Sequence, residues 1–266
     1  MIKKIIYISL MSFISMNYTF AEEFEDFKIK LKSIDQTAFD NVKVRNTDID
    51  GVYEVTLKKG NILYIDKEAK NFIKGDIYVR HNGQLLNKTE QNARLKNKEI
   101  IEGIVKDYND SIAYYPSKLN KVVSSIYVFS DFTCPYCKKF HQDLDNINKA
   151  GIEVFYIPFP RKSLVDTGVV RGLQKIICSD DRAETFNIAF INPNGFINSV
   201  KNDEISCPKS INVMEFNNYG NEMQIQGTPA IFTKNGSVIH GYNGALDFVT
   251  ELKKNIEDEK LWGMEN

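Results

Sequence analysis

The sequence predicts two domains joined by a helix: an α+β N-terminal domain, a linker helix and an α/β C-terminal domain with a helical insertion. Three patterns lead to this fold class. Helix-like and strand-like runs fill the residues up to about 80, a polar segment with one apolar helical face follows, and strand and helix patterns then alternate. We place the domains at residues 22–83, 84–120 and 121–266, after a signal peptide at residues 1–21.

The composition is that of a globular protein. Hydrophobic residues make up 42% of the chain and charged residues 26%, which excludes a disordered or membrane-embedded class. The 34 basic and 35 acidic residues leave a formal net charge of −1. This balance gives no electrostatic reason to expect nucleic acid as a partner.

The first residues read as a cleavable signal peptide. Lys3 and Lys4 precede an apolar stretch, Ile5–Met16, which is short for a membrane span, and Thr19-Phe20-Ala21 offers small residues at the two positions that a signal peptidase reads. A buried helix could look similar, but the leading lysines and the acidic Glu22-Glu23 favour a signal. We therefore expect export and a mature chain that begins at Glu22.

The N-terminal domain combines a helix with a meander of strands. One apolar helical face comprises Phe24, Phe27, Leu31 and Ile34. Strands at 52–57 and 62–65 meet at a hairpin turn, Lys59-Gly60-Asn61, and 72–73 and 77–79 extend the meander. So small a unit has little core, and its apolar strand residues predict a partner surface; they are Tyr53, Val55, Leu57 and Ile77. A second copy of the chain is the common solution, so we expect a homodimer.

The linker helix is predicted from a start signal and one apolar face. Asn87-x-x-Glu90 loosely resembles a capping box, and Pro116 stops the pattern. The apolar face comprises Ile101, Ile104, Val105, Tyr108 and Ile112. This helix can be a surface helix, a connector between domains, or both.

The C-terminal domain opens with a strand–helix–strand unit. Strands at 125–129 and 152–157 flank one helix that runs from Cys134 to Gly151, an order that predicts a parallel pair with a right-handed crossover. A helical stretch at about 164–190 follows, with Pro193 and Gly195 as breakers. A hairpin at 229–232 and 237–240 turns at Asn235-Gly236, and a helix at 245–257 closes the domain.

Cys134-Pro135-Tyr136-Cys137 is the most specific chemical signal, because it stands between a strand and a helix. The free N–H groups and the dipole of a helix start favour a thiolate at the first sulfur, and Pro135 fits the first helical position. We expect an exposed Cys134 to attack disulfides and Cys137 to resolve the mixed disulfide. Lys138 and Lys139 can add positive charge or simply be solvated.

Two other uses of these cysteines are weaker. An inert disulfide between adjacent turns would not account for the position of the cysteines between a strand and a helix. A zinc site would need a second C-x-x-C or a Cys/His pair, and the sequence has neither. We expect no metal and no cofactor beyond the Cys134–Cys137 dithiol.

Gly227-Thr228-Pro229 lies between a helical segment and an apolar strand. Its proline is a candidate cis peptide, although Thr-Pro is also an ordinary start to a strand.

Cys178 and Cys207 remain, and a structural disulfide that pins the helical insertion is the favoured use of them in an oxidising compartment. Such a bond would contribute about 3–4 kcal/mol on the chain-entropy model. A second redox pair is the alternative.

The histidines carry weaker signals. His141 lies one turn beyond Cys137 and could touch the electrostatics of the thiolate, or could be a surface or packing residue. His81 and His240 receive no role.

The chain resembles the DsbC/DsbG family of bacterial periplasmic disulfide isomerases over essentially all of residues 22–266. Residues 128–137 (VFSDFTCPYC) resemble the active-site segment of that family, 156–161 (YIPFPR) the segment after its second catalytic strand, and 227–230 (GTPA) its cis-proline loop. Asn235-Gly236 with Gly241-Tyr242 resembles the hairpin beyond, and 51–55 and 63–65 resemble its dimerisation domain.

The resemblance implies a V-shaped homodimer, with N-terminal dimerisation domains, linker helices and two thioredoxin-like catalytic domains that face a cleft. It implies that Pro229 faces the cysteines and that Thr228 pairs with the substrate backbone. It also implies a membrane thiol reductase of the DsbD type as electron donor and a structural Cys178–Cys207 disulfide. Pro135-Tyr136 resembles the DsbG branch, whereas Gly-Thr-Pro resembles the DsbC branch.

The function expected from these patterns is a periplasmic isomerase and reductase that rearranges incorrect disulfides in exported proteins and holds its substrates as a chaperone does. The alternatives are a DsbG-like thiol reductase, a net oxidase, and a redox-inert holdase chaperone.

Overall fold

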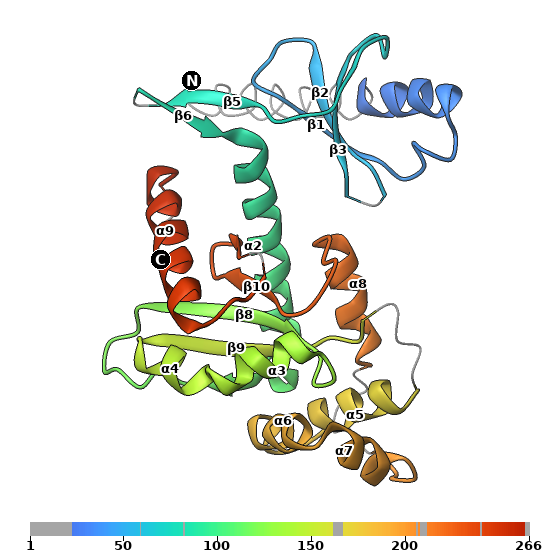
Figure 1. The fold of residues 1–266 in the computed structure, drawn as a ribbon. Helices are drawn as coiled ribbons and strands as arrows, with labels where there is room; N and C mark the ends of the chain where they lie inside the picture. Colours follow the sequence, from blue (N-terminus) through green and yellow to red (C-terminus); the bar gives the residue numbers. More distant parts are fainter. Residues whose placement is uncertain are drawn as a thin grey trace, which may run out of the picture. The chain divides into compact units, whose positions relative to one another are not determined.

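The computed structural model describes residues 23–58, 60–81, 83–161, 167–205, 207, 212–239 and 241–263 (Figure 1). The predicted signal peptide, Lys59 of the first hairpin turn and His240 lie outside the described residues. The chain divides after Ile77 into two compact units, and each is considered by itself. Among the described residues, no helix is both long and apolar enough to cross a membrane.

The first unit is a helix followed by a four-stranded antiparallel meander. Residues 23–34 are helical, and the strands are β1 (Lys43–Asn46), β2 (Val52–Thr56), β3 (Ile62–Asp66) and β4 (Phe72–Ile73), in that spatial order. The hairpin of β2 and β3 and the short β4 confirm the predicted meander as far as residue 73. Its predicted extension at 77–79 was wrong, because residues 78–81 pair with residues 84–87 in a separate two-stranded sheet. The sequence did not predict β1, because its Lys-Val-Arg-Asn run is an edge strand with mostly exposed side chains and no alternation.

This unit buries a core of its own. Phe27 and Leu31 of the helix pack with Val55 and Ile65 of the sheet, and the Phe27 and Tyr53 ring centroids lie 4.7 Å apart. Burying each such side chain contributes about 1.5–3 kcal/mol. Our use of Tyr53 and Val55 as evidence for a partner surface was therefore wrong, because both are internal. The exposed apolar residues of the sheet are instead on β4, where Phe72 is 43% and Ile73 58% exposed.

The second unit begins with a hairpin and a long helix. Strands β5 (Tyr78–His81) and β6 (Gln84–Asn87) pair, and α2 (Lys88–Tyr108) follows directly. The predicted start signal is confirmed, because the Asn87 side chain accepts a hydrogen bond from the Glu90 N–H at 3.0 Å. Ile101 and Ile104 are buried in the core of this unit.

The predicted extension of the linker helix to Pro116 was wrong. After α2 the chain makes a short 3₁₀ turn, η1 (Asn109–Ser111), and then strand β7 (Ala113–Tyr115). Strand β7 pairs antiparallel with β9 (Ile152–Pro158) and so completes one edge of the sheet. Ile112 matched the helical period by coincidence, since its burial comes from the sheet core.

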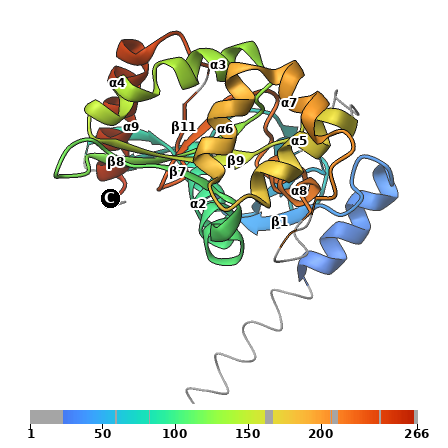
Figure 2. The ribbon, with the colours of Figure 1, turned by 90° about the horizontal axis from the view of Figure 1, so that it is seen from below.

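A five-stranded sheet organises the second unit, in the order β11-β10-β8-β9-β7. Strand β8 (Ser124–Ser130) is parallel to β9, which confirms the predicted strand–helix–strand unit. Strands β10 (Ala230–Thr233) and β11 (Val238–Ile239) form the predicted hairpin. The crossover helices cover one face of the sheet and α2 lies on the other (Figure 2).

The crossover is two helices and not the single one predicted. Helix α3 (Pro135–Gln142) ends at Asp143, whose N–H bonds the carbonyls of Lys139 and Phe140, and α4 (Leu144–Lys149) starts at once. The Asp143 carboxylate also accepts a hydrogen bond from the Tyr242 hydroxyl at 2.8 Å. This long-range contact fixes the break and has no local sequence signal.

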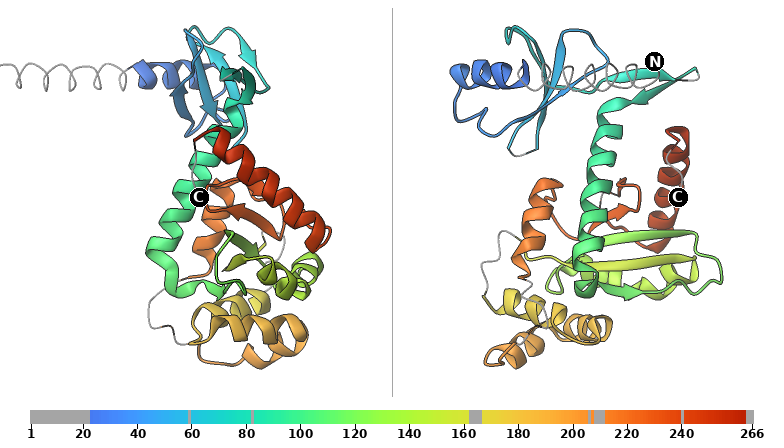
Figure 3. Two further views of the ribbon diagram at one scale, coloured as in Figure 1. Left: turned by 90° about the vertical axis from the view of Figure 1, so that its left-hand side faces the viewer. Right: turned by 180° about the vertical axis from the view of Figure 1, so that it is seen from behind.

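The insertion contains helices α5 (Thr167–Ile177), α6 (Arg182–Ile191), α7 (Pro193–Val200) and α8 (Met214–Glu222). Helices α5, α6 and α7, drawn in yellow and gold, gather at one end of the unit (Figure 3). Helix α6 ends just before Pro193, as expected of a breaker, and Pro193 is also the first residue of α7, the position where a missing N–H costs nothing. Gly195 was wrongly predicted as a breaker, because it lies inside α7. Helix α9 (Ala245–Leu261) closes the unit and extends beyond the predicted end at 257.

Helix α2 is fixed to the rest of its unit at the β10–β11 turn. The Asn97 amide donates to the Gly236 carbonyl at 3.1 Å. Gly236 has φ +83°, and a Cβ there would lie 2.0 Å from the Arg94 carbonyl oxygen, so only glycine fits. Close by, the buried Glu259 carboxylate accepts hydrogen bonds from Thr233, Asn235 and Ser237.

Candidate redox-active site

The cysteine pair lies where β8 gives way to α3. Cys134 is the N-cap residue with extended backbone angles, φ −79° and ψ 124°, and Pro135 occupies the first helical position. The Cys134 N–H bonds the Asp131 carbonyl at 3.0 Å. This local structure follows from the sequence, because proline favours the first turn and the residue before proline favours extended angles.

Both cysteines are buried and unbridged. Cys137 is 0% exposed and lies against the sheet, as expected. Cys134 is only 3% exposed, so our expectation of an exposed sulfur was wrong. Its sulfur lies 3.2 Å from the backbone carbonyl oxygen of Thr228, to which only the protonated thiol can donate, and this loop covers it.

The Thr228–Pro229 peptide bond is cis, and it leads directly into β10. Strand β10 pairs antiparallel with β8, which brings residue 230 opposite Phe129. The sheet register therefore carries the Thr228 loop to the same edge as the cysteine pair. Thr228 itself is 9% exposed.

The two thiols differ strongly in acidity. Hydrogen bonding by the Cys137 thiol is the main cause that lowers the pKa of Cys134 to about 5, with help from Thr228 and from the N–H groups of Cys137 and Tyr136, while burial opposes this shift. Burial raises the pKa of Cys137 well above its ordinary value of 9.0, and its hydrogen bond to Cys134 acts in the same direction. Near neutral pH the pair therefore holds one thiolate and one protonated thiol.

This arrangement suits thiol–disulfide exchange. A thiolate is the nucleophile for a disulfide sulfur, and a low-pKa thiol is also a good leaving group. The buried thiol keeps its proton until the environment of the first sulfur changes. Of the two lysines of α3, Lys139 donates from its ammonium group to the Asn243 carbonyl at 2.9 Å.

Three residues beside the pair were missed as site residues by the sequence reasoning. Asp131 is fully buried, and Arg161 donates from Nε to its carboxylate at 2.8 Å and from a terminal nitrogen to the Thr133 hydroxyl at 3.1 Å. Two of these residues could have been found from their positions in the sequence. Each of Asp131 and Arg161 follows one of two adjacent parallel strands, and such strands end at the same edge of a sheet.

His141 is a packing residue. Its ring stacks on Phe190 with centroids 4.4 Å apart, and Nδ1 lies 3.4 Å from the Tyr156 hydroxyl. Burial lowers the pKa of His141 to about 4, so it is neutral near pH 7. Of the other histidines, His81 lies exposed on β5 and His240 is outside the described residues.

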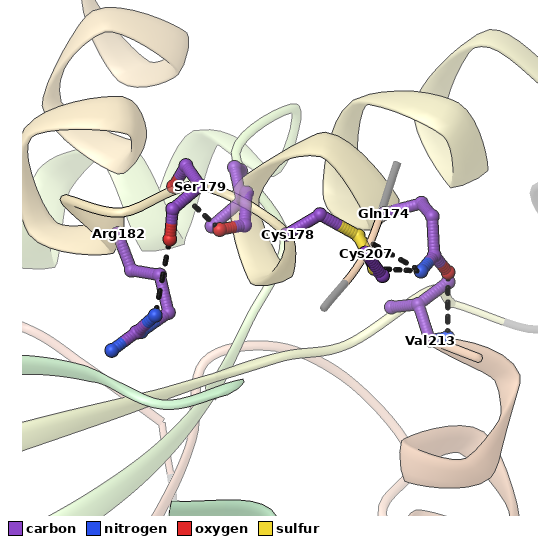
Figure 4. The surroundings of a disulfide bond; sticks show 7 residues. Gln174, Cys178, Ser179, Arg182, Cys207 and Val213 are labelled. Carbon is purple, nitrogen blue, oxygen red and sulfur yellow. Dashed lines mark hydrogen bonds between the residues drawn. A yellow bond between two sulfur atoms is a disulfide. The ribbon is translucent and has the colours of Figure 1, made fainter. Parts of the chain in front are cut away.

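Cys178 and Cys207 are joined by a disulfide in the helical insertion, the pairing that the sequence favoured. Gln174 lies one turn before Cys178 on α5, and its amide nitrogen is 3.3 Å from each sulfur (Figure 4). The amide oxygen of Gln174 accepts a hydrogen bond from the Val213 N–H at 2.9 Å. This one side chain thus links the disulfide to the start of α8. Across the described residues, no group of three or more His, Cys, Asp or Glu side chains is arranged to hold a metal ion.

Comparison with known families gives two matches. Residues 110–257 match the thioredoxin-like domain family, and residues 21–90 match the disulfide bond isomerase protein N-terminal domain. The thiol:disulfide interchange protein DsbC of Dickeya dadantii is 27% identical over 231 residues, 86% of this chain and 87% of the relative. DsbC of Salmonella typhimurium is 26% identical over 226 residues, 84% and 86% of the two chains. A solved disulfide interchange protein from Neisseria gonorrhoeae superposes with a TM-score of 0.44 at 20% identity, over 59% of this chain and 98% of that chain.

The sheet, the Cys-Pro-Tyr-Cys helix start and the facing cis-proline define a thioredoxin-like oxidoreductase that acts by thiol–disulfide exchange. The thioredoxin-like match spans more than half of the chain, and the N-terminal match and the DsbC relatives narrow the assignment. The chain belongs to the DsbC/DsbG family of thiol:disulfide isomerases.

Proposed function

We propose that this chain is a periplasmic protein disulfide isomerase and reductase that rearranges incorrect disulfides in exported proteins. The observation that carries the proposal is the difference in acidity within one helical turn. Cys134 has a pKa of about 5, while burial raises the pKa of Cys137 well above 9.0. The pair needs no cofactor, because the dithiol itself supplies the electrons.

In the first step the Cys134 thiolate attacks one sulfur of a substrate disulfide. The substrate S–S bond breaks, its second sulfur leaves as a thiolate, and a mixed disulfide with Cys134 forms. The low pKa of Cys134 keeps it ionised at periplasmic pH. Thr228 borders the Cys134 sulfur through its carbonyl, and we assign it the pairing with the substrate backbone.

Two routes lead out of the mixed disulfide. In isomerisation, a substrate thiolate attacks the mixed disulfide and re-forms a substrate disulfide, so Cys134 leaves as a thiolate with no net electron transfer. In reduction, Cys137 loses its proton and attacks the Cys134 sulfur, which releases the substrate as a dithiol and leaves a Cys134–Cys137 disulfide. A membrane thiol reductase of the DsbD type would then return two electrons to that disulfide.

The assembly and location extend the proposal. The match of residues 21–90 to the isomerase N-terminal domain supports a homodimer, and the DsbC relatives support a periplasmic location. We assign the export of the chain to the signal peptide predicted at residues 1–21. Substrate holding, as by a chaperone, belongs to the same proposal. Pro135-Tyr136 between the cysteines would set the balance between isomerase and reductase activity.

The test is refolding of a scrambled multi-disulfide substrate, with trapping of intermediates. Cys137→Ser should accumulate mixed disulfides with the substrate, because attack is retained and resolution is lost. Cys134→Ser should form none and should lose isomerase activity. If Cys134→Ser refolds the scrambled substrate as well as the native chain does, the proposal fails. If that variant only suppresses aggregation, a holdase role remains.

A further inference from the structure

An ion pair between a buried carboxylate and a partly exposed guanidinium lies directly beside the loop that presents Cys134. Asp131 follows β8 and is 0% exposed, and Arg161 follows β9. The Arg161 Nε atom donates to Asp131 Oδ2 at 2.8 Å. The parallel pairing of the two strands runs to the level of Ser130 and Pro158, and this register brings the two side chains together.

Thr133 closes the arrangement into a ring of three side chains. Its N–H and its hydroxyl both donate to Asp131 Oδ1, at 2.8 and 2.6 Å. A terminal nitrogen of the Arg161 guanidinium donates a hydrogen bond to the Thr133 hydroxyl at 3.1 Å. Since the Cys134 N–H also bonds the Asp131 carbonyl at 3.0 Å, every residue from 131 to 134 except Phe132 is held by this network.

Phe132 is held by packing. It is 1% exposed, its ring meets Phe196 edge-on with centroids 5.5 Å apart, and a Cβ at Gly172 would lie 2.8 Å from its ring. The loop before Cys134 therefore has no loose residue, and Arg161 supplies its outermost polar contacts.

The backbone that carries Arg161 is fixed from two sides. The Phe159 N–H bonds the Ser130 carbonyl at 2.9 Å, and the buried Asn217 amide of α8 donates to the Pro160 carbonyl at 2.7 Å. A Cβ at Gly220 of α8 would lie 2.3 Å from the Phe159 ring, so α8 packs tightly on this segment. The guanidinium is thus presented from a rigid support.

We propose that Arg161 is a positioning residue for the exchange reaction: paired with Asp131 and Thr133, it holds the 131–134 loop and neutralises a carboxylate buried next to the cysteine pair. The proposal rests on the proposed function of Cys134. An unpaired carboxylate buried there would disfavour a nearby thiolate, and the charge of Arg161 removes that repulsion.

The electrostatics agree with this geometry. Burial acts to lower the pKa of Arg161, but its hydrogen bond with Asp131 and the charges of Asp131, Cys134 and Cys137 together raise it. Interactions between charges are mutual, so the guanidinium favours the thiolate form of both cysteines. Among the described residues, the thiol of Cys137 is the main group that shifts the pKa of Cys134, and Arg161 interacts with both cysteines through its charge.

The first test is the thiolate absorbance of Cys134 near 240 nm, titrated with pH in the reduced full-length chain. Arg161→Gln should raise the pKa of Cys134 and slow its alkylation at pH 6 about tenfold, the change expected for one pKa unit. Arg161→Lys keeps the charge but cannot serve both acceptors in the same geometry. It should restore most of the pKa while substrate attack stays slower than in the native chain.

A double variant separates the effect of charge from the effect of packing. Asp131→Asn with Arg161→Gln removes both charges, so the pKa of Cys134 should return toward that of the native chain. The matched control is Arg171→Gln, which removes an arginine that bonds the Val200 and Asp203 carbonyls in the insertion and should leave the titration unchanged. Circular dichroism verifies folding. If Arg161→Gln does not fold, the lysine and double variants give the same comparison.

A native titration in folded Arg161→Gln, or an equal rise in the double variant, would overturn the proposal. The titration needs no substrate, so it stays readable if the isomerase assay fails. In that case the proposed function fails while the role of Arg161 stands.

Discussion

The thiol of Cys137 hydrogen bonds with Cys134 and is the largest cause of the low pKa of Cys134. The relationship is asymmetric, because Cys137 is fully buried and keeps its proton while Cys134 gives its proton up. A mixed disulfide at Cys134 removes the negative charge that this hydrogen bond serves. The hydrogen bond from Cys137 therefore stabilises the Cys134 thiolate before it attacks a substrate. After the attack Cys134 carries no negative charge, so the hydrogen bond becomes weaker.

This contact predicts different results for two small substitutions of Cys137. Cys137→Ser keeps a donor, so the pKa of Cys134 should stay near 5. Cys137→Ala removes the donor, so the pKa should rise toward its ordinary value, and the alkylation rate at pH 6 should fall several-fold, by about tenfold for each pKa unit gained. Titration of the thiolate absorbance measures both. Equal titrations in the two variants would show that the hydrogen bond is not the cause.

The shifted acidity of Cys134 also predicts how the reduced protein responds to pH. The pKa of its thiol is about 5 in the folded chain against an ordinary value of 9.0, so ionisation favours the folded state above pH 9 and this contribution is lost as the pH falls through 5. Between these limits the contribution changes by about 1.4 kcal/mol for each pH unit. Ionisation of Cys137 lies above this window, because burial raises its pKa.

Urea unfolding with a non-thiol reductant, at several pH values between about 4.5 and 7.5, measures this effect. The free energy of unfolding of the native chain minus that of Cys134→Ser should increase with pH over this range. The subtraction removes the titration of all other groups. A difference that stays constant with pH would contradict the assignment of a thiolate at Cys134.

The disulfide should act on stability and not on redox chemistry. Changing both Cys178 and Cys207 to Ala should lower the free energy of unfolding by about 3–4 kcal/mol, since the bond closes a loop with a sequence separation of 29. The Cys134 titration should be unchanged. A second redox pair would instead show as lost turnover in the isomerase assay with the fold intact.

The sequence predicted most of the site because its chemistry is local. Cys134 and Cys137 stand at a strand–helix junction that turn and capping rules recognise, and the Thr228-Pro229 step stands out before an apolar strand. The exposure of the cysteines could not be predicted from the neighbouring sequence. Cys134 is covered by a loop 94 residues further along the chain, and no pattern around the cysteine reports that cover.

The missed elements share one physical cause, since each depends on a partner distant in the chain. Strand β7 exists because β9 offers an edge, and the break at Asp143 is fixed by Tyr242. The ion pair of Asp131 and Arg161 needed the register of two parallel strands. Periodicity finds which face of an element is buried, but it does not say which polar groups meet at the end of a sheet.

The last prediction concerns the contact between α2 and the β10–β11 turn. Gly236 has φ +83°, and a Cβ there would lie 2.0 Å from the Arg94 carbonyl oxygen and 2.6 Å from the Lys98 nitrogen. Both are backbone atoms of a helix and cannot move aside cheaply. Gly236→Ala therefore adds a steric cost of about 1–3 kcal/mol to the backbone cost of a left-handed alanine, which is about 1–2 kcal/mol.

Gly83 provides a matched control, because its φ is +82° and a Cβ there would meet nothing within 4 Å. Gly83→Ala should cost only the backbone part. We expect urea unfolding of the two variants to differ by the steric part alone, with Gly236→Ala the less stable. Equal losses would contradict a steric conflict between residue 236 and the backbone of α2.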